Sequence, residues 1–345
     1  MTVTASPETA RPVLAGGFDR LFGARVLIVT GKGGVGKTTV AAALALASAG
    51  SGRRTMLVEV EGRQGFSRVF RTQPWDYQER EFRPGLYGTA IDPQDAMFEY
   101  LELFYGLKHV SWVMSRSNAL DFVTAAAPGL RDLLLVGKLY EIQKRRRPDG
   151  RPAYDLIVLD APPTGRIVPF LQAPEGVTEI VRVGPIRRQA GNVAEMLEDP
   201  RRTQALVVTL LEEMPVTETV EAVMALRKAG IDLGPLVANQ VLRPRFDEDE
   251  AAALEEIGVP GLADRAAAGG VALDPRLATL AYEQTLIHRD RVALQQRMRD
   301  RLEGTGMPLI ELPLLTGATF DATDLEVLAD HVALTVGEPG PRARL

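Results

Sequence analysis

The segment VTGKGGVGKTT, residues 29–39, is the most informative part of this sequence. It follows a short apolar run at 26–29 and leads into the apolar stretch 40–49, which has the length of a helix. Residues 31–38 fit the pattern G-x-x-x-x-G-K-[ST], and the strand-to-helix context is the one that this pattern requires. The segment therefore predicts a phosphate-binding loop between a strand and a helix.

Each position of this loop has a predicted task. Glycines let the backbone turn tightly, so that its N–H groups converge on phosphate oxygens, and the following helix adds its dipole. Lys37 is expected to neutralise the β- and γ-phosphates, and the Thr38 hydroxyl is expected to ligate Mg²⁺. The predicted nucleotide-binding residues of the loop are Gly31, Gly33, Gly34, Val35, Gly36, Lys37, Thr38 and Thr39.

Composition excludes several classes of site. The 345 residues include no cysteine, which removes disulfides, thiolate catalysis, Cys-ligated zinc and iron–sulfur clusters. The three histidines are far apart and show no metal-binding spacing. The net charge of −5 argues against non-specific DNA binding as the main task, so we expect no nucleic-acid partner.

The N-terminus lacks a basic segment followed by an apolar one, so it does not predict a signal peptide. The longest apolar stretch, 40–49, is shorter than the roughly 20 residues that span a bilayer. We expect a cytoplasmic protein.

Short apolar runs recur along the chain. Near-continuous Val, Ile and Leu suit parallel strands buried on both faces, and helical patterns such as 37–49 and 217–229 lie between the runs. This alternation predicts an α/β fold, with a mostly parallel, doubly wound P-loop sheet flanked by helices. The predicted strands are 25–30, 54–60, 86–91, 154–160, 205–210, 233–238 and 308–312.

We predict a single P-loop domain over residues 21–336, between a flexible N-terminus, 1–20, and a flexible tail, 337–345. Two helical insertions, at about 94–147 and 175–202, are too long for plain crossovers. They are expected to form an α-helical subdomain beside the sheet, and long crossover helices are the alternative.

Lys32 is a second lysine at the start of the loop. With it, residues 32–38 match K-G-G-x-G-K-[ST], and the chain resembles the deviant Walker A class of P-loop ATPases at every position of that pattern. In that class the first lysine reaches the partner's nucleotide across a dimer interface. The resemblance implies a catalytic role for Lys32 in trans, where it places positive charge on the phosphates during transfer. A solvated surface lysine is the alternative.

The next motif distinguishes members of this class. The apolar run 154–160 ends at Asp160, which is placed as a Walker B carboxylate for Mg²⁺. The residues that follow, APPTGR at 161–166, resemble the switch II string D-x-A-P-T-G-H of the family of arsenite-pump and tail-anchored-protein-targeting ATPases. The stretches 127–142 and 207–223 resemble two further segments of that family, in order. The predicted metal residues are Thr38 and Asp160.

The resemblance extends over about residues 25–320. Asn239 matches the family's asparagine that contacts adenine, and ELPLLTGATF, 311–320, which includes Pro313, resembles the segment that closes the other side of the base. The resemblance implies ATP and Mg²⁺ as cofactors. The catalytic residues that it implies are Lys32, Lys37, Glu61 and Asp160.

The departures from the family pattern are informative. Glu61 stands where the family usually has the aspartate that orients the attacking water, and glutamate can do that work with a different reach. Arg166 replaces the usual histidine of switch II. The thiolates of the family's arsenite sites and its zinc-bridging C-x-x-C are absent. Arsenite stimulation is therefore not expected, and any dimer must be held by protein contacts and nucleotide.

The string VEVEGRQG, 58–65, resembles a bacterial branch of the family that is labelled anion-transporting ATPase. Some members of that branch occur with a diverged paralogue. The resemblance therefore leaves two assemblies open, a homodimer and a heterodimer with a paralogous ATPase.

The helical region contains a candidate partner surface. The stretch 95–105 places apolar side chains on one helical face. In the targeting ATPase the matching region is a groove for a client's transmembrane helix, and packing as the core of a subdomain is the alternative. The residues concerned are Met97, Phe98, Leu101, Phe104 and Tyr105, followed by Trp112, Val113, Met114, Phe122 and Val123.

Three hypotheses for the function follow. The first is a dimeric ATPase that couples its nucleotide state to a helical surface for a hydrophobic-helix client or a membrane partner, in membrane-protein targeting. The second is a weakly active regulatory subunit of a heteromeric ATPase, motivated by Glu61. The third is a partition-type ATPase with a membrane helix at 324–336, although that stretch carries acidic residues and no lysine or arginine.

Overall fold

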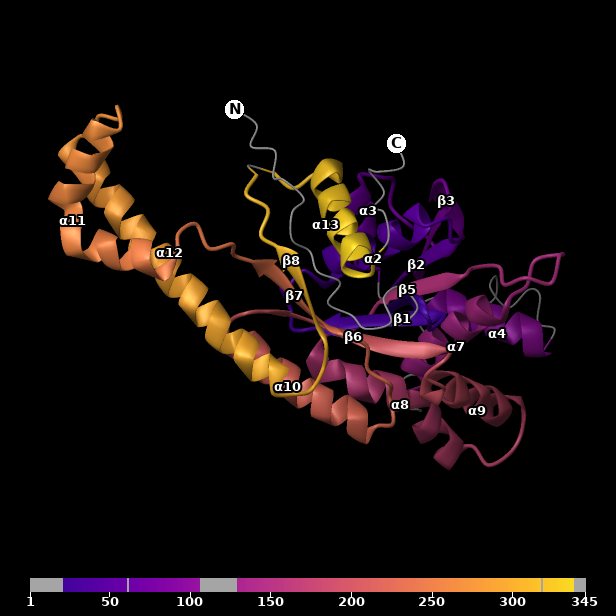
Figure 1. The fold of residues 1–345 in the computed structure, drawn as a ribbon. Coiled ribbons are helices and arrows are strands. Elements are labelled where there is room, and N and C mark those ends of the chain that lie inside the picture. The colour runs from indigo at the N-terminus through magenta and orange to yellow at the C-terminus, as the bar shows by residue number, and fades with distance from the viewer. Residues whose placement is uncertain (1–20, 61, 106–128, 318, 338–345) are drawn as a thin grey trace.

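This computed structural model describes residues 21–60, 62–105, 129–317 and 319–337 (Figure 1). One sheet of eight strands forms its centre, in the order β3-β4-β2-β5-β1-β6-β7-β8. All neighbouring pairs are parallel except β3 and β4. The predicted α/β fold class is therefore confirmed. The strands are β1 (Val26–Gly31), β2 (Thr55–Val60), β3 (Arg80–Arg83), β4 (Leu86–Ile91), β5 (Leu156–Asp160), β6 (Thr203–Leu210), β7 (Leu236–Val241) and β8 (Leu309–Pro313).

Helices cover both faces of the sheet (Figure 1). Helices α2, α3 and α13 lie on one face and bury one apolar cluster, and α7 to α10 lie on the other face over a second cluster. Every residue of β1, β2 and β5 is buried, as expected for central parallel strands. The bounds are α2 (Lys37–Gly50), α3 (Gly65–Phe70), α4 (Pro93–Tyr105), α7 (Leu130–Lys144), α8 (Thr164–Ile180), α9 (Pro185–Glu198), α10 (Glu213–Lys228) and α13 (Ala322–Thr335).

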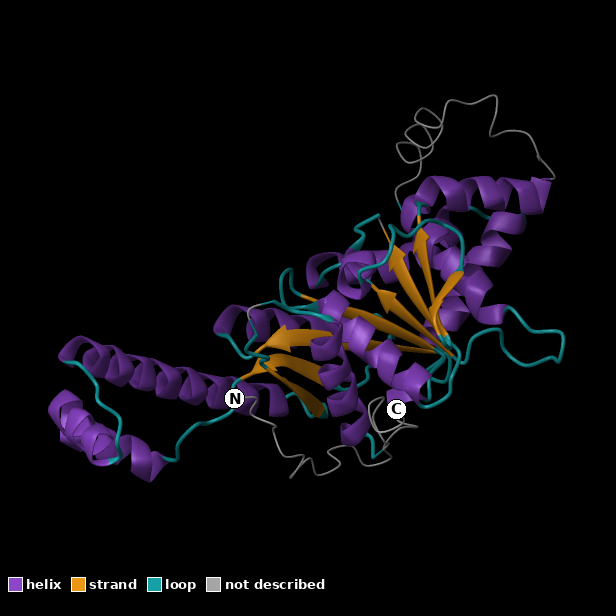
Figure 2. Cartoon of the chain, turned by 90° about the horizontal axis from the view of Figure 1, so that it is seen from above, coloured by secondary structure: helices purple, strands orange, loops and turns teal. Residues whose placement is uncertain are grey.

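Two helices form an arm that projects from the sheet (Figure 2). They are α11 (Glu248–Ala268) and α12 (Pro275–Glu303), which pack against each other. The C-terminal end of α12 is the root of the arm, because Leu302 is buried in the core there. Sequence patterns did not predict this arm.

Most predicted strands agree with the observed ones within a few residues. The exception is β3, a short antiparallel strand with exposed and half-buried residues that was not predicted. The largest offset is that of β7, which begins three residues after its predicted start at 233. Residue Leu233 instead forms an isolated bridge to Ala205. Among the described residues, no helix combines the length and apolar character needed to cross a membrane.

Within the predicted insertions, the described residues form α4, α7, the end of α8, and α9. An ionic network ties α4 to α7. Lys138, which is buried, donates to Glu99 at 2.7 and 2.8 Å and pairs with Glu141 at 2.7 Å. The Tyr77 hydroxyl also donates to Glu99, and burial together with this hydrogen bond raises the pKa of Tyr77. The network fixes the two helices relative to the edge of the sheet.

We expect Lys138→Met to lower the free energy of unfolding by about 2–4 kcal/mol, because it leaves two carboxylates close together without their cation. Lys144→Met removes an exposed lysine from the same helix and should change stability by less than about 0.5 kcal/mol. Urea denaturation of both variants measures the difference, and equal stabilities would contradict the assigned role of the network.

Candidate active site

The phosphate loop connects the C-terminal end of β1 to α2 at the centre of the sheet. Two of its glycines are required by close contacts. A Cβ on Gly31, at φ 149°, would lie 2.1 Å from the Val208 carbonyl oxygen of β6. A Cβ on Gly36, at φ 87°, would lie 2.4 Å from Nδ2 of Asn239 in β7. The loop therefore rests directly on the ends of the neighbouring strands.

The two lysines of the loop have different surroundings. Lys37 is buried, and its Nζ donates to the Lys32 carbonyl oxygen at 3.0 Å. Burial lowers the pKa of Lys37, and the nearby Asp160 opposes that shift. The Lys32 side chain is 30% exposed. Its Nζ pairs with Glu218 on α10 at 2.5 Å.

Asp160 ends β5 directly beside β1 and faces the start of α2. Its Oδ2 accepts a hydrogen bond from the Thr38 hydroxyl at 2.6 Å. Burial raises the pKa of Asp160, while the Thr38 hydrogen bond and the Arg63 and Lys37 charges oppose the rise. Its Oδ1 is buried without a hydrogen-bond partner among the described residues. The two predicted metal residues are thus in contact.

Switch II, which follows Asp160, is held from two sides. The Thr30 hydroxyl of β1 donates to the Pro162 carbonyl oxygen at 2.7 Å. The Thr164 hydroxyl, at the start of α8, donates to Glu218 at 3.3 Å. Glu218 therefore contacts both the loop lysine and switch II, and sequence reasoning did not select it. It lies inside the stretch 207–223, but burial and partners are not visible in that pattern.

The predicted water-orienting residue, Glu61, lies outside the described residues. After it, Gln64 at φ 54° leads into α3. Two hydrogen bonds to the Trp75 backbone fix the Gln64 side chain. Its Oε1 accepts from the Trp75 N–H, and its Nε2 donates to the Trp75 carbonyl oxygen, both at 2.8 Å. Gln64 is the last residue of the segment 61–64, which stands at the position of the family's switch I, and it is anchored at the edge of the sheet.

The predicted base-contacting residues lie on neighbouring strands, Asn239 on β7 and Pro313 at the end of β8. Asn239 is buried, and its Nδ2 donates to the Val35 carbonyl oxygen of the loop at 2.9 Å. The structure therefore connects Asn239 to the loop backbone, and its contact with adenine stays a prediction.

The site fits a divalent cation that arrives with a nucleotide. A hydroxyl at Thr38 and a buried, unsatisfied oxygen at Asp160 are hard oxygen donors of the kind that Mg²⁺ prefers. The described residues hold no group of three or more His, Cys, Asp or Glu side chains in metal-binding geometry. Mg²⁺ usually combines one or two protein ligands with substrate phosphates and waters, which agrees with this donor set.

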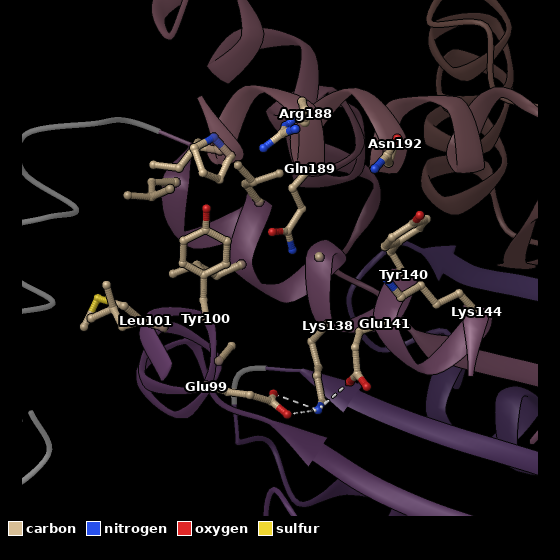
Figure 3. A pocket seen from close by; sticks show the side chains of 18 of the residues that line it. Glu99, Tyr100, Leu101, Lys138, Tyr140, Glu141, Lys144, Arg188, Gln189 and Asn192 are labelled. Atoms are coloured by element: carbon tan, nitrogen blue, oxygen red, sulfur yellow. Dashed lines mark hydrogen bonds and ion pairs between the residues drawn. The ribbon is translucent and has the colours of Figure 1, made fainter. Parts of the chain in front are cut away.

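A separate cavity of about 580 Å³ lies between α4, α7 and α9 (Figure 3). Lys138 and its two carboxylate partners lie at one end, and Gln189 and Tyr100 point into it. Met97 and Leu101 line the cavity, and Leu101 and Leu134 pack against Met97, so the same side chains form a small apolar cluster and a wall of the cavity. Residues 106–128, which hold the other predicted surface residues, and the side chains of Phe104 and Tyr105 lie outside those described.

Sequence comparisons with known proteins find relatives that are named ATPases. The sequence profile of the family described as anion-transporting ATPase matches residues 24–192 and 185–256. The ATPase BagA of Mycobacterium tuberculosis is 40% identical over 325 residues, which are 91% of this chain and 94% of that protein. The arsenical pump-driving ATPase of Escherichia coli is 29% identical over 246 residues, which are 66% of this chain and 41% of that protein.

Gly36→Ala should lower the free energy of unfolding by about 1–3 kcal/mol, because it combines a left-handed backbone with a clash against Asn239. Gly33→Ala is the matched control, since a Cβ there meets nothing within 4 Å. Its expected change is below about 0.5 kcal/mol. Chemical denaturation without nucleotide tests both, and a Gly36 variant as stable as the control would refute the packing argument.

Proposed function

The chain belongs to the anion-transporting ATPase family, and from this we propose that it hydrolyses ATP as a dimer in which Lys32 acts across the interface. The nucleotide state of the dimer would control a helical surface formed by α4, α7 and α9. Membership of the family shows that the chain is an ATPase, and the dimer and the partner surface are what we propose.

The residues of the site support this reaction. The loop backbone and the N-terminus of α2 offer N–H groups to the phosphates, and Lys37 supplies a fixed charge. Thr38 and Asp160 would hold the divalent cation, which neutralises phosphate charge when bound. The catalysis required of the protein is therefore positioning and charge stabilisation, and an extra cation from a partner would add to both.

The observation that carries the proposal is the position of Lys32. Its side chain lies at the surface, paired with Glu218, which is itself 33% exposed. An ion pair at this degree of exposure is worth about 1 kcal/mol or less, so it can exchange for a stronger partner such as a phosphate. This weak ion pair supports the proposal that Lys32 can leave Glu218 of its own subunit and contact the nucleotide of the other subunit.

The contacts of switch II connect the nucleotide to the helical surface. Thr164, which donates to Glu218, is the first residue of α8. Helix α8 packs against both α7 and α9, and these helices line the 580 Å³ cavity. A change at the phosphates that moves switch II would therefore act on the cavity wall through α8. This path favours a partner or an apolar helical client at that surface.

We expect Lys32→Ala to bind ATP with unchanged affinity and to lose turnover by at least about 100-fold, because a charge supplied in trans acts mainly in the transition state. A nucleotide-binding titration measures the affinity and an ATPase assay measures the turnover. Light scattering of the same samples, with ADP and a metal-fluoride phosphate mimic, measures dimerisation. Lys228→Ala, which removes an exposed lysine from α10, is the control.

The outcomes separate the assemblies. A wild-type dimer that tightens with the mimic, with turnover that depends on Lys32, supports the homodimer. A wild-type protein that binds nucleotide but neither dimerises nor hydrolyses points to the regulatory subunit of a heterodimer with a paralogue. Full turnover by Lys32→Ala would refute the role in trans.

Glu218→Gln should favour the nucleotide-dependent dimer by up to about fivefold, because it weakens the pair that holds Lys32 within its own subunit by about 1 kcal/mol at most. Glu221→Gln neutralises an exposed glutamate on the same helix and is the control. The dimer dissociation constant in the presence of the mimic is the measured quantity. A weaker dimer would show that Glu218 supports the interface instead.

A further inference from the structure

Glu59 is a second buried carboxylate at the site, and neither the sequence motifs nor the comparisons assign it a role. It lies on β2 with none of its surface exposed. Its register partner on the adjacent parallel strand β5 is Asp160. Register partners on parallel strands point to the same face of the sheet, so both carboxylates point toward the phosphate loop.

One oxygen of Glu59 has a structural task and the other does not. Oε2 accepts a hydrogen bond from the Phe66 N–H of α3 at 3.0 Å. Oε1 is buried and finds no hydrogen-bond donor in the described parts of the chain. A single oxygen is enough to hold Phe66, and a neutral glutamine would provide it. A charged group is therefore not explained by this contact, since burying an unpaired charge is costly.

The space around Glu59 connects it to the predicted metal residue Thr38. A Cβ on Gly65 would lie 3.3 Å from Thr38 Oγ1 and 3.5 Å from Glu59 Oε2. Gly65, which begins α3, therefore sits between the hydroxyl and the carboxylate without a side chain to separate them. Two carboxylates, each with an unsatisfied buried oxygen, and one hydroxyl meet beside the loop.

We propose that Glu59 is a second carboxylate of the cation site, whose free Oε1 accepts a hydrogen bond from a water in the shell of a divalent cation bound with the nucleotide. The negative charge of Glu59 thus adds to that of Asp160 and increases the affinity for the hydrated cation. Through Oε2, the same side chain links the cation to α3, the helix that follows switch I. Glu59 is a positioning residue, and the proposal rests on the proposed binding of a nucleotide with a divalent cation.

The test measures Mn²⁺ binding to the full-length protein with saturating ADP, by electron paramagnetic resonance of the free ion. Glu59→Gln retains the acceptor for Phe66 and removes the charge. We expect it to weaken Mn²⁺ affinity by about 10- to 100-fold, the range found when groups around a metal's ligands are removed. ADP affinity in EDTA should not change. The melting temperature of the metal-free protein should not fall, because the repulsion between Glu59 and Asp160 is removed.

Two further variants make the result specific. Glu79→Gln alters another carboxylate with a structural role, which accepts from Arg145 and Tyr154 at 2.7 Å, and should leave Mn²⁺ affinity unchanged. Glu59→Asp retains the charge on a shorter side chain and should weaken Mn²⁺ binding, but by less than Glu59→Gln. If Glu59→Gln does not fold, the Glu59→Asp variant provides the test. A Mn²⁺ affinity of Glu59→Asp equal to that of the wild type then overturns the proposal.

The outcomes also distinguish this proposal from the one on which it rests. Equal Mn²⁺ affinity in wild type and Glu59→Gln, with both binding the ion, overturns the role of Glu59 alone. Absence of ADP-dependent Mn²⁺ binding in the wild type overturns both the nucleotide–cation site and the role of Glu59. If Glu59→Gln has a lower melting temperature than the wild type but the same Mn²⁺ affinity, the role of Glu59 is purely structural.

Discussion

The contact between the phosphate loop and the strand ends is the constraint on which the other features of the site depend. Gly31 lies against the Val208 carbonyl oxygen, and Gly36 lies against Asn239, so the loop has its shape only when β6 and β7 are in register beside β1. On the other side of β1, β5 presents Asp160 to Thr38. The loop, the acidic residue and the base-side strand are therefore positioned by one set of backbone pairings, and a shift in any of them would disturb all three.

Sequence patterns predicted the parts of the fold whose burial is uniform. The strands β1 and β5 are fully buried, and their apolar runs predicted central parallel strands that are covered on both faces. Strand β3 is exposed or half-buried with the sequence REFR, and it pairs only because β4 lies beside it. The arm was not predicted because α12 buries Ala278 and Leu302 alone among its residues and so lacks the broad apolar stripe of a core helix. Its stability comes from its neighbouring helix and its root, which no local pattern shows.

The site divides in the same way. Lys32, Lys37 and Thr38 stand at fixed spacings within the loop, and Asp160 ends an apolar run directly before switch II, so local sequence order marks all four. Glu59 and Glu218 have no such spacing. Each is significant because a distant segment lies against it: β5 beside Glu59, and the loop and switch II beside Glu218. Asn239 was selected by resemblance, and its contact with the Val35 carbonyl oxygen could not be foreseen, because the two residues are 204 positions apart in the sequence and meet only in the folded sheet.

The geometry of the arm means that a small rotation at its root would produce a larger displacement at its tip. Its root is fixed to three elements of the ATPase: Gln295 accepts from the Leu242 N–H just beyond β7, Arg299 pairs with Glu311 of β8, and Arg301 donates to Thr217 of α10. Thr217 adjoins Glu218, the partner of Lys32. A helix of 29 residues is about 44 Å long, so a turn of about 5° at the root displaces the far end by about 4 Å. A rotation of this size at the root would thus move the tip by about the width of a side chain, although it is too small to open a pocket at the phosphates.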